Sequence, residues 1–297
     1  MLPDWLDIAN QGMNVKENNS ILFSYSYKQN LRVVYSNYCF LVIPYGPVAS
    51  YSSLMNCKLS VNVNAIAFLR NRRHVPWPSL VGLAKIALDA GAHGITVHPR
   101  PDERHIRRTD VTELRAMLRT GFPGREFNIE GYPDERFLAL CETENPDQVT
   151  LVPDDPSQST SDHGWDFASH QNWLSGVIDR LHEGKMRVSV FVDPDPAAAA
   201  LAKTVGADRI EIYTGPYGGA SGDAMLPEFN KVVATGNAAA TAGIGLNAGH
   251  DLTRENLPRL VAALPNLQEV SIGHAITADA LEFGMAETVR MFRAAIS

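Results

Sequence analysis

Histidine, glutamate and asparagine side chains recur at or near the ends of short β-forming runs along most of this chain. Imidazoles and carboxylates are the groups that move protons near neutral pH. In a barrel of alternating strands and helices, such residues collect on the loops after the strands, where that fold carries its chemistry. The pattern therefore predicts an enzyme before any single motif is interpreted. The residues concerned are Asn62, His98, Glu130, Glu211, His250 and His274.

One loop, TVHPRPDERHIRR, holds two histidines and several arginines. His98 stands at the end of the preceding strand-like run, with Arg100, Arg104 and His105 a few residues later. An imidazole can shuttle protons there, and guanidinium forks suit phosphate oxygens. The alternative is a solvated polar loop. Two imidazoles and several arginines on one loop favour a functional role.

Two glutamates stand within or at the end of β-forming runs. Glu130 follows Phe-Asn-Ile and should face the barrel mouth, where burial raises a carboxyl pKa and suits it to act as a general base. The alternative for Glu130 is an ion pair with a nearby arginine. Glu211 lies between Ile210 and Ile212, and a charge there needs a partner or a purpose. Glu211 either stabilises a protonated intermediate or forms an internal salt bridge, and the residues do not decide between these.

Two later loops, NAGHD and SIGHA, each carry a Gly-His pair. These are Gly249-His250 and Gly273-His274. In an eight-stranded barrel the loops after strands 7 and 8 commonly bind phosphate through backbone N–H groups. Glycine lets the backbone approach an anion closely. A pair at each of these two loops predicts a phosphate site.

The elements that must position these residues alternate regularly between strand and helix patterns. Such alternation predicts a parallel sheet, and eight repeats predict a closed (β/α)8 barrel of the TIM type. A doubly wound open sheet is disfavoured because no GxGxxG follows the first strand. The predicted strands are Leu59–Val63, Gly94–Val97, Glu126–Glu130, Gln148–Val152, Arg187–Val192, Arg209–Tyr213, Gly243–Asn247 and Glu269–Ile272. The predicted helices are Ser79–Ala90, Thr109–Thr120, Asp134–Thr143, His170–Glu183, Pro196–Val205, Pro227–Ala242, Thr253–Ala263 and Ala278–Ala295.

Three joints between a helix and the next strand repeat one theme, in DAGAHGITV, TVGADRIEI and TAGIGLNAG. We expect each first glycine to end its helix in a left-handed conformation, after which the chain enters a buried strand.

The composition of the chain disfavours several classes of function. The chain has 297 residues, is 45% hydrophobic and carries a formal charge of −7, which disfavours nucleic-acid and anionic-membrane binding. No stretch is long and apolar enough to span a bilayer, and the first residues lack a basic signal-peptide region. The three scattered cysteines indicate a reducing, cytoplasmic location. No lysine falls at the C-terminal end of a strand and no residues have convincing metal-ligand spacing, so neither a Schiff-base aldolase nor a metal-dependent barrel hydrolase is expected.

The first 56 residues differ from the remainder, because they hold six of the nine tyrosines and little helical periodicity. We expect residues 1–56 to form a leader outside the barrel and residues 57–297 to form the catalytic domain. The leader is either an accessory arm or an upstream extension of a reading frame that starts at Met55. The second interpretation is preferred, and native N-terminal peptides that precede Met55 would contradict it.

The motifs from about Lys58 to the C-terminus resemble those of the pyridoxine 5'-phosphate synthase family. The resemblance rests on SVNVNAIAFLRNRR, VHPRPDERHIRR, EFNIEGYP, VTLVPDDPSQSTSDHGWD, RIEIYTGPY, GLNAGHDLT and VSIGHAI. It implies a (β/α)8 barrel that acts as a transferase-type synthase in vitamin B6 biosynthesis. Members condense 1-deoxy-D-xylulose 5-phosphate with 3-amino-2-oxopropyl phosphate to pyridoxine 5'-phosphate, inorganic phosphate and water. The resemblance implies no cofactor, and a homo-oligomer, with an octamer typical.

The resemblance also implies residue roles. His98 and Glu130 match proton acceptors, His250 matches the proton donor, and Glu211 matches the transition-state stabiliser. Positions that match the amino ketone phosphate site are Asn62, Arg73, Gly273 and His274, and those that match the sugar phosphate site are Arg100, His105 and Thr160. Asn64 and Asp251 are further expected substrate contacts.

Two departures from the family pattern concern these sites. Asn64-Ala65 stands where many members carry Asp-His, so Asn64 can still bind a hydroxyl but Ala65 cannot. Asp251 stands where other members have glycine. Both are interpreted as features of a branch of the family. Two alternatives stay open, which are a catalytically weakened phosphate-binding barrel and another phosphosugar isomerase or lyase.

Overall fold

The computed structural model describes residues 31–36, 39–44, 57–154, 158 and 160–297. The chain divides into two compact units, Met1–Leu54 and Met55–Ser297. In the first unit, β1 (Leu31–Ser36) pairs with β2 (Cys39–Pro44) in an antiparallel two-stranded sheet. These strands belong to a sheet of their own, so no barrel strand is drawn from the predicted leader. The predicted boundary between residues 56 and 57, and the preferred start at Met55, stay predictions.

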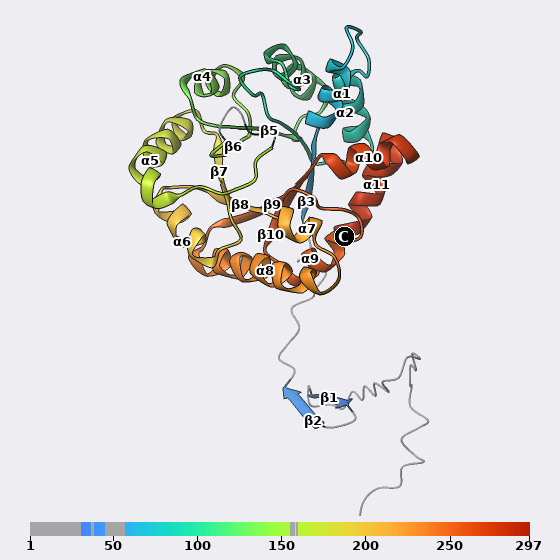
Figure 1. Ribbon diagram of the computed structural model, residues 1–297, viewed down its shortest axis with the longest axis vertical. Coiled ribbons are helices and arrows are strands. Elements are labelled where there is room, and N and C mark those ends of the chain that lie inside the picture. The colour runs from blue at the N-terminus through green and yellow to red at the C-terminus, as the bar shows by residue number, and fades with distance from the viewer. Residues whose placement is uncertain (1–30, 37–38, 45–56, 155–157, 159) are drawn as a thin grey trace, which may run out of the picture. The chain divides into compact units, whose positions relative to one another are not determined.

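The second unit is a closed barrel of eight parallel strands ringed by helices (Figure 1). Neighbouring strands follow the chain order, and the last strand, β10, pairs with the first, β3. The prediction of a (β/α)8 barrel is confirmed, with all eight strands within two residues of their expected starts. The strands are β3 (Lys58–Asn62), β4 (Gly94–Val97), β5 (Glu126–Gly131), β6 (Gln148–Leu151), β7 (Arg187–Val192), β8 (Arg209–Tyr213), β9 (Gly245–Gly249) and β10 (Leu267–Ile272).

The helices also follow the predicted order, with several differences. The helices are α1 (Asn64–Asn71), α2 (Leu80–Asp89), α3 (Arg108–Gly121), α4 (Glu135–Glu144), α5 (Phe167–Glu183), α6 (Pro196–Thr204), α7 (Gly215–Gly219), α8 (Met225–Ala242), α9 (Leu257–Ala263), α10 (His274–Phe283) and α11 (Met285–Ala295). A short 3₁₀ helix, η2 (Gly222–Ala224), precedes α8. Sequence analysis did not predict α1 or α7. Both are single short helices in the loops after β3 and β8, too brief to show a clear apolar period.

Local backbone and side-chain chemistry explains the shifted boundaries. The predicted C-terminal helix is divided between α10 and α11, because Gly284 takes a φ of 77° that a continuous helix cannot contain. Helix α5 begins earlier than expected because the Asp166 side chain accepts the N–H groups of Ala168 and Ser169. Helix α9 begins later, because Thr253 and Asn256 form a hydrogen-bonded turn before it.

The three glycine joints have the predicted conformation. Gly91, Gly206 and Gly243 have φ values of 108°, 92° and 65°, a region that other residues rarely adopt. Each ends a helix just before a barrel strand, so this prediction is confirmed. Among the described residues, no helix is long and apolar enough to cross a membrane.

The barrel interior is unusually polar for this fold, whose interior is typically filled by bulky branched residues. A ladder of side-chain hydrogen bonds crosses four neighbouring strands. Ser60 bonds to Thr96 at 2.7 Å, Asn128 donates to Thr96 at 3.3 Å, and Thr150 donates to Asn128 at 3.1 Å. All four side chains are buried, so mutual hydrogen bonding offsets the cost of removing them from water.

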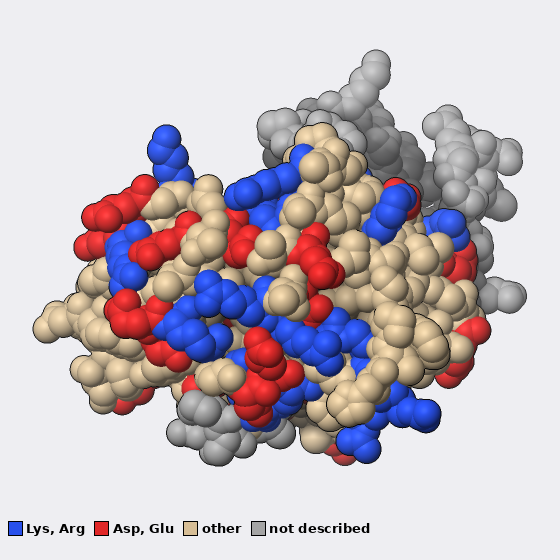
Figure 2. All heavy atoms as spheres, turned by 90° about the horizontal axis from the view of Figure 1, so that it is seen from above, with Lys and Arg blue, Asp and Glu red and all other residues tan. Residues whose placement is uncertain are grey.

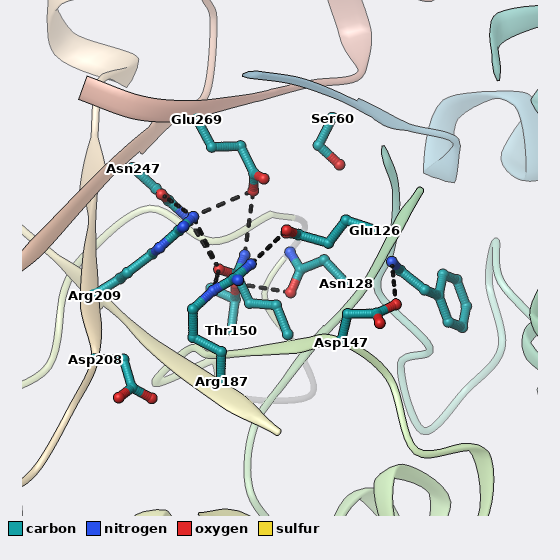
Figure 3. A network of polar contacts seen from close by, with 12 residues as sticks. Ser60, Glu126, Asn128, Asp147, Thr150, Arg187, Asp208, Arg209, Asn247 and Glu269 are labelled. Carbon is teal, nitrogen blue, oxygen red and sulfur yellow. Dashed lines mark hydrogen bonds and ion pairs between the residues drawn. The ribbon is translucent and has the colours of Figure 1, made fainter. Parts of the chain in front are cut away.

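Charged residues close the end of the barrel where the strands begin (Figure 3). Arg187 lies 2.5 Å from Glu126 and donates to Gln148 at 2.9 Å. Gln148 in turn donates to Glu269 at 3.2 Å, and Arg209 reaches Gln148 at 3.5 Å. Figure 3 shows both arginines directed toward the two glutamates across the interior. This end therefore supports the barrel, while the opposite end is open to carry chemistry.

The exterior carries mixed charge. On the face shown in Figure 2, Lys and Arg side chains gather in a band that Asp and Glu side chains interrupt. Ion pairs also join neighbouring helices, including Arg180 with Glu135 at 2.9 Å and with Glu142 at 2.6 Å. Exposed pairs of this kind add little stability, because water already solvates both charges.

Candidate active site

A cavity of about 980 Å³ opens at the end of the barrel where the strands finish. Its wall includes almost every residue that sequence analysis placed at the site. Arg73 is one exception, since the neighbouring Arg72 lines the cavity in its place, and Gly249 is another. The predicted residues in the wall are Asn62, Asn64, His98, Arg100, His105, Glu130, Thr160, Glu211, His250, Asp251, Gly273 and His274.

Glu130 ends β5 and presents its carboxyl group to the cavity. Asn62 donates an amide N–H to its Oε2 at 3.4 Å. Burial raises the pKa of Glu130 well above its ordinary value, and the nearby charge of Glu211 raises it further. Among the described residues Glu130 forms no ion pair with an arginine, so the structure does not support that alternative. Its ionised form is consequently a stronger base than an exposed glutamate.

Glu211 lies in the middle of β8 with only 2% of its surface exposed. Burial raises its pKa to about 7, and a hydrogen bond from Thr150 acts in the opposite direction. No described residue forms a salt bridge with Glu211, so the structure does not support that alternative, and its role toward a protonated intermediate stays a prediction. Gly249, on the neighbouring β9, makes room for this carboxyl group, because a Cβ atom there would lie 2.4 Å from Oε1.

His98 follows β4 and is buried beside a second imidazole. Its backbone N–H donates to the Oδ1 atom of Asn64 at 2.9 Å, and its ring lies 6.1 Å from that of His105. Burial, followed by the positive charge of Arg100, holds the pKa of His98 well below its usual value. The same causes lower the pKa of His105 to about 4. Both rings are therefore neutral near pH 7 and able to accept a proton.

His250 follows β9 in a left-handed backbone conformation, with a φ of 77°. Its ring contacts the rings of Phe191 and Tyr213, each at a centroid distance of 5.3 Å. Burial lowers the pKa of His250, and the neighbouring charge of Asp251 partly opposes that effect. The ring is thus packed against two aromatic side chains at the cavity wall, and its role as proton donor stays a prediction.

Arg100 is already engaged inside the protein. Its guanidinium group forms a buried ion pair with Asp154 and donates to the carbonyl of Gln158 at 3.1 Å. Ser161 donates to the same carboxylate at 2.7 Å. Sequence analysis did not single out Asp154 or Ser161. The position of Asp154 just beyond the end of β6 is the signal that could have identified it.

Two hydroxyl groups near the start of α10 were also missed. Ser271 and Thr277 line the cavity, and within the described residues neither hydroxyl has a hydrogen-bond partner. Gly273 precedes α10 and His274 begins it, so the unpaired N–H groups of the first turn lie beside these hydroxyls. A helix N-terminus with neighbouring hydroxyls suits an anion, and the phosphate site predicted from the Gly-His pairs stays a prediction. No group of three or more described His, Cys, Asp or Glu residues has an arrangement that could hold a metal ion.

Comparison with known proteins identifies the family. Residues 59–297 match the family model described as "Pyridoxal phosphate biosynthesis protein PdxJ". The chain belongs to this family. A protein from Chelativorans sp. (strain BNC1) named pyridoxine 5'-phosphate synthase is 60% identical over 245 residues, which cover 81% of this chain and 99% of that protein. A synthase of the same name from Agrobacterium fabrum is 59% identical over 242 residues, which cover 80% and 96% of the two chains.

Solved structures with the same fold are much more distant in sequence from this member of the family. The YdjI aldolase from Escherichia coli K12 superposes with a TM-score of 0.54 at 12% identity, covering 82% of this chain and 89% of that one. Tryptophan synthase from M. tuberculosis gives a TM-score of 0.54 at 13% identity, covering 83% and 95%. At these identities the likeness establishes the barrel fold alone.

The structure gives the two departures from the family pattern a local role. Asn64 accepts the backbone N–H of His98 and donates its own backbone N–H to Asn62 at 2.9 Å, so it ties two cavity loops together. Ala65 lines the cavity without a polar group. Asp251 has a φ of 54° and an exposed side chain. Its backbone carbonyl accepts the side-chain N–H of Asn256 at 3.1 Å, within the same loop.

Proposed function

We propose that this chain is a pyridoxine 5'-phosphate synthase. It condenses 1-deoxy-D-xylulose 5-phosphate with 3-amino-2-oxopropyl phosphate, and releases pyridoxine 5'-phosphate, inorganic phosphate and water. The observation that carries the proposal is that four acid/base groups with displaced pKa values face one cavity. They are His98, Glu130, Glu211 and His250. Displaced pKa values of this kind cluster at catalytic sites.

The reaction needs several proton transfers rather than one nucleophile, because imine formation, phosphate elimination, water loss and ring closure each move protons. Glu130 and the neutral imidazole of His98 serve as proton acceptors, and His250 serves as proton donor. The buried carboxylate of Glu211 serves to stabilise a cationic intermediate.

Both substrates are phosphate esters, so the site must hold anions at two places. The start of α10, with Asn62, Gly273 and His274, suits the phosphate of the amino ketone. Arg100, His105 and Thr160, which also line the cavity, suit the sugar phosphate. Asn64 and Asp251 line the same cavity and contribute further substrate contacts. Arg73 joins the first group only if its loop moves inward when substrate binds.

The proposal extends to assembly and location. The chain acts as a homo-oligomer, with an octamer expected from the family resemblance, in the cytoplasm. Light scattering of the full chain tests the assembly, because a monomeric mass contradicts it.

The decisive test supplies both phosphates to purified protein and follows pyridoxine 5'-phosphate by mass spectrometry, with each substrate omitted in turn. Product only when both are present supports the synthase. Tight binding of either phosphate without product favours the weakened binding barrel and makes Ala65 the first position to restore to histidine. Turnover of one phosphate without the other favours an isomerase or lyase. The His250→Gln variant serves as the negative control.

A further inference from the structure

A five-residue helix, α7, packs against the loop that carries His250. Helix α7 follows β8 and the His250 loop follows β9, so both belong to neighbouring strands at the open end of the barrel. Neither α7 nor the residue before it, Thr214, is among the predicted site residues. Their contacts bear directly on the backbone of the loop.

Thr214 is fully buried and bonds to the end of β9 and the start of the His250 loop. Its hydroxyl group shares one proton between the carbonyls of Gly249 and His250, the latter at 2.7 Å, and its backbone N–H donates to the carbonyl of Gly249 at 2.8 Å. The carbonyl of His250 belongs to the peptide unit that leads into Asp251. The hydroxyl of Thr214 therefore fixes the orientation of the backbone directly after the imidazole.

The backbone of His250 and Asp251 needs contacts from neighbouring residues to keep its conformation. His250 and Asp251 have φ values of 77° and 54°, a left-handed region that non-glycine residues rarely occupy. Two such residues in succession persist only where surrounding contacts determine the conformation. A relaxed loop would return both residues to negative φ and turn the imidazole away from its present place.

Further contacts from α7 support the same loop. A Cβ atom at Gly218 would lie 2.2 Å from the carbonyl oxygen of Asp251, so the two backbones touch at a distance that only glycine permits. Tyr217 donates its hydroxyl to the carbonyl of Asn256 at 2.9 Å. Asn256 donates its side-chain amide to the carbonyl of Asp251 at 3.1 Å. The loop is therefore held on both sides of the strained pair.

We propose that Thr214 is a positioning residue for His250, and that its hydroxyl, backed by the close approach of Gly218 to Asp251, holds the loop in the left-handed conformation that places the imidazole against Phe191 and Tyr213. Thr214 does not touch the reacting atoms. Its effect on turnover rests on the proposed function of His250, whereas its effect on the position of the ring does not.

The test compares Thr214→Val, which keeps the side-chain shape and removes the hydroxyl, with Thr214→Ser, which keeps the hydroxyl. Misplacement of a catalytic group by about 1 Å can cost about 100-fold in rate, so we expect kcat of Thr214→Val to fall by between about 10-fold and 100-fold with KM nearly unchanged. We expect Thr214→Ser to restore most of kcat. The imidazole of His250, followed by NMR and assigned with His250→Gln, should titrate at a higher pH in Thr214→Val, because a released ring is more solvated.

Two further variants complete the design. Thr235→Val is the matched control, because Thr235 is also fully buried but donates to a helical carbonyl of α8 at 2.9 Å, outside the cavity wall. Gly218→Ala forces the loop to shift without changing Thr214 and should reproduce the effect on His250, so the test survives if Thr214→Val fails to fold.

The outcomes are distinct. An unchanged kcat and an unchanged His250 titration in folded Thr214→Val overturn the inference, and so does an equal loss in Thr235→Val. If the unsubstituted protein forms no product, the proposed function fails, but a displaced His250 titration in Thr214→Val still supports the positioning role.

Discussion

The backbone of Gly249 lies directly against the carboxyl group of Glu211. A Cβ atom at Gly249 would stand 2.4 Å from Oε1 of Glu211, a distance that atoms do not tolerate. Gly249 belongs to β9 and Glu211 to β8, which pair in the barrel wall. The absence of a side chain at Gly249 thus determines where the Glu211 carboxylate on the neighbouring strand can lie.

We predict that Gly249→Ala displaces the Glu211 carboxylate and lowers kcat on the order of 100-fold, the cost of misplacing a catalytic group. Steady-state assays with both phosphates measure the effect. Gly176→Ala is the matched control. Gly176 lies in α5, and a Cβ atom there would have no neighbouring atom within 4 Å. Alanine at this position should stabilise the helix by up to about 1 kcal/mol. Equal activity of the two variants would contradict the prediction.

Glu130→Gln should abolish ring closure and leave substrate binding largely intact. The isostere keeps the shape of the side chain and the contact with Asn62 but removes the base, a loss of about 100-fold to 10,000-fold in rate. Stopped-time product assays and calorimetric titration with each phosphate separate the two effects. Glu113→Gln, at an exposed position on α3, is the control. Near-normal turnover of Glu130→Gln would refute its role as a base.

Glu211 should make the protein less stable as the pH rises from about 4.5 to 7. Its folded-state pKa of about 7 lies above that of an exposed glutamate, about 4.3. Below that window both states are protonated. Inside it the unfolded chain ionises while the folded chain does not, so the free energy of unfolding falls until the pH passes 7.

Glu211→Gln removes this penalty, because glutamine ionises in neither state. The variant should gain free energy of unfolding relative to the unsubstituted protein between pH 5 and pH 8, by up to about 3 kcal/mol at about 1.4 kcal/mol for each pKa unit. Urea unfolding at the two pH values measures the difference. A difference in unfolding free energy between the two proteins that stays constant or narrows with rising pH would show that burial does not raise the pKa of Glu211.

The ion pair between Arg70 and Asp110 should carry more stability than any surface pair. Arg70 donates to both carboxylate oxygens, at 2.6 and 2.8 Å, and the two side chains are only 10% and 7% exposed. Asp110→Asn leaves a buried guanidinium without its counter-charge and should cost about 3–5 kcal/mol. Urea unfolding measures this cost.

The control for that experiment is Arg290→Met, which breaks an exposed pair with Glu287 at 59% and 56% exposure. It should cost less than about 1 kcal/mol, because both charges are already solvated. Similar losses of unfolding free energy in the two variants would mean that the buried pair stabilises the fold no more than an exposed pair does. The buried pair also bears on the site, since Arg70 and Asn71 both donate to the carbonyl of His105.

Sequence analysis predicted the barrel because its determinants are local. Alternating strand and helix periods repeat eight times, and glycines such as Gly91 and Gly206 end helices by their own backbone preference. Polar residues that follow strands, such as His98 and Glu130, meet at one end because parallel strands all finish there. These inferences need only neighbours along the chain and the symmetry of the fold.

The short helices α1 and α7 escaped prediction because tertiary contacts, rather than a local period, hold them. Helix α1 depends on Arg70 reaching Asp110, 40 residues away, and α7 depends on the loop after β9. The choice of Arg72 rather than Arg73 in the cavity wall has the same origin, since both stand just after α1 and its packing decides which of them faces inward.

Residue order thus settled the architecture and the end of the barrel that carries the chemistry, because periodicity and strand direction follow from local chain geometry. Packing between distant residues decided the protonation chemistry and the fine geometry. Burial raises the pKa of Glu211, Asp154 forms an ion pair with Arg100, and Thr214 donates a hydrogen bond to the backbone carbonyl of His250. Desolvation and side-chain contact depend on which atoms surround a group in space, and only the folded chain brings those atoms together.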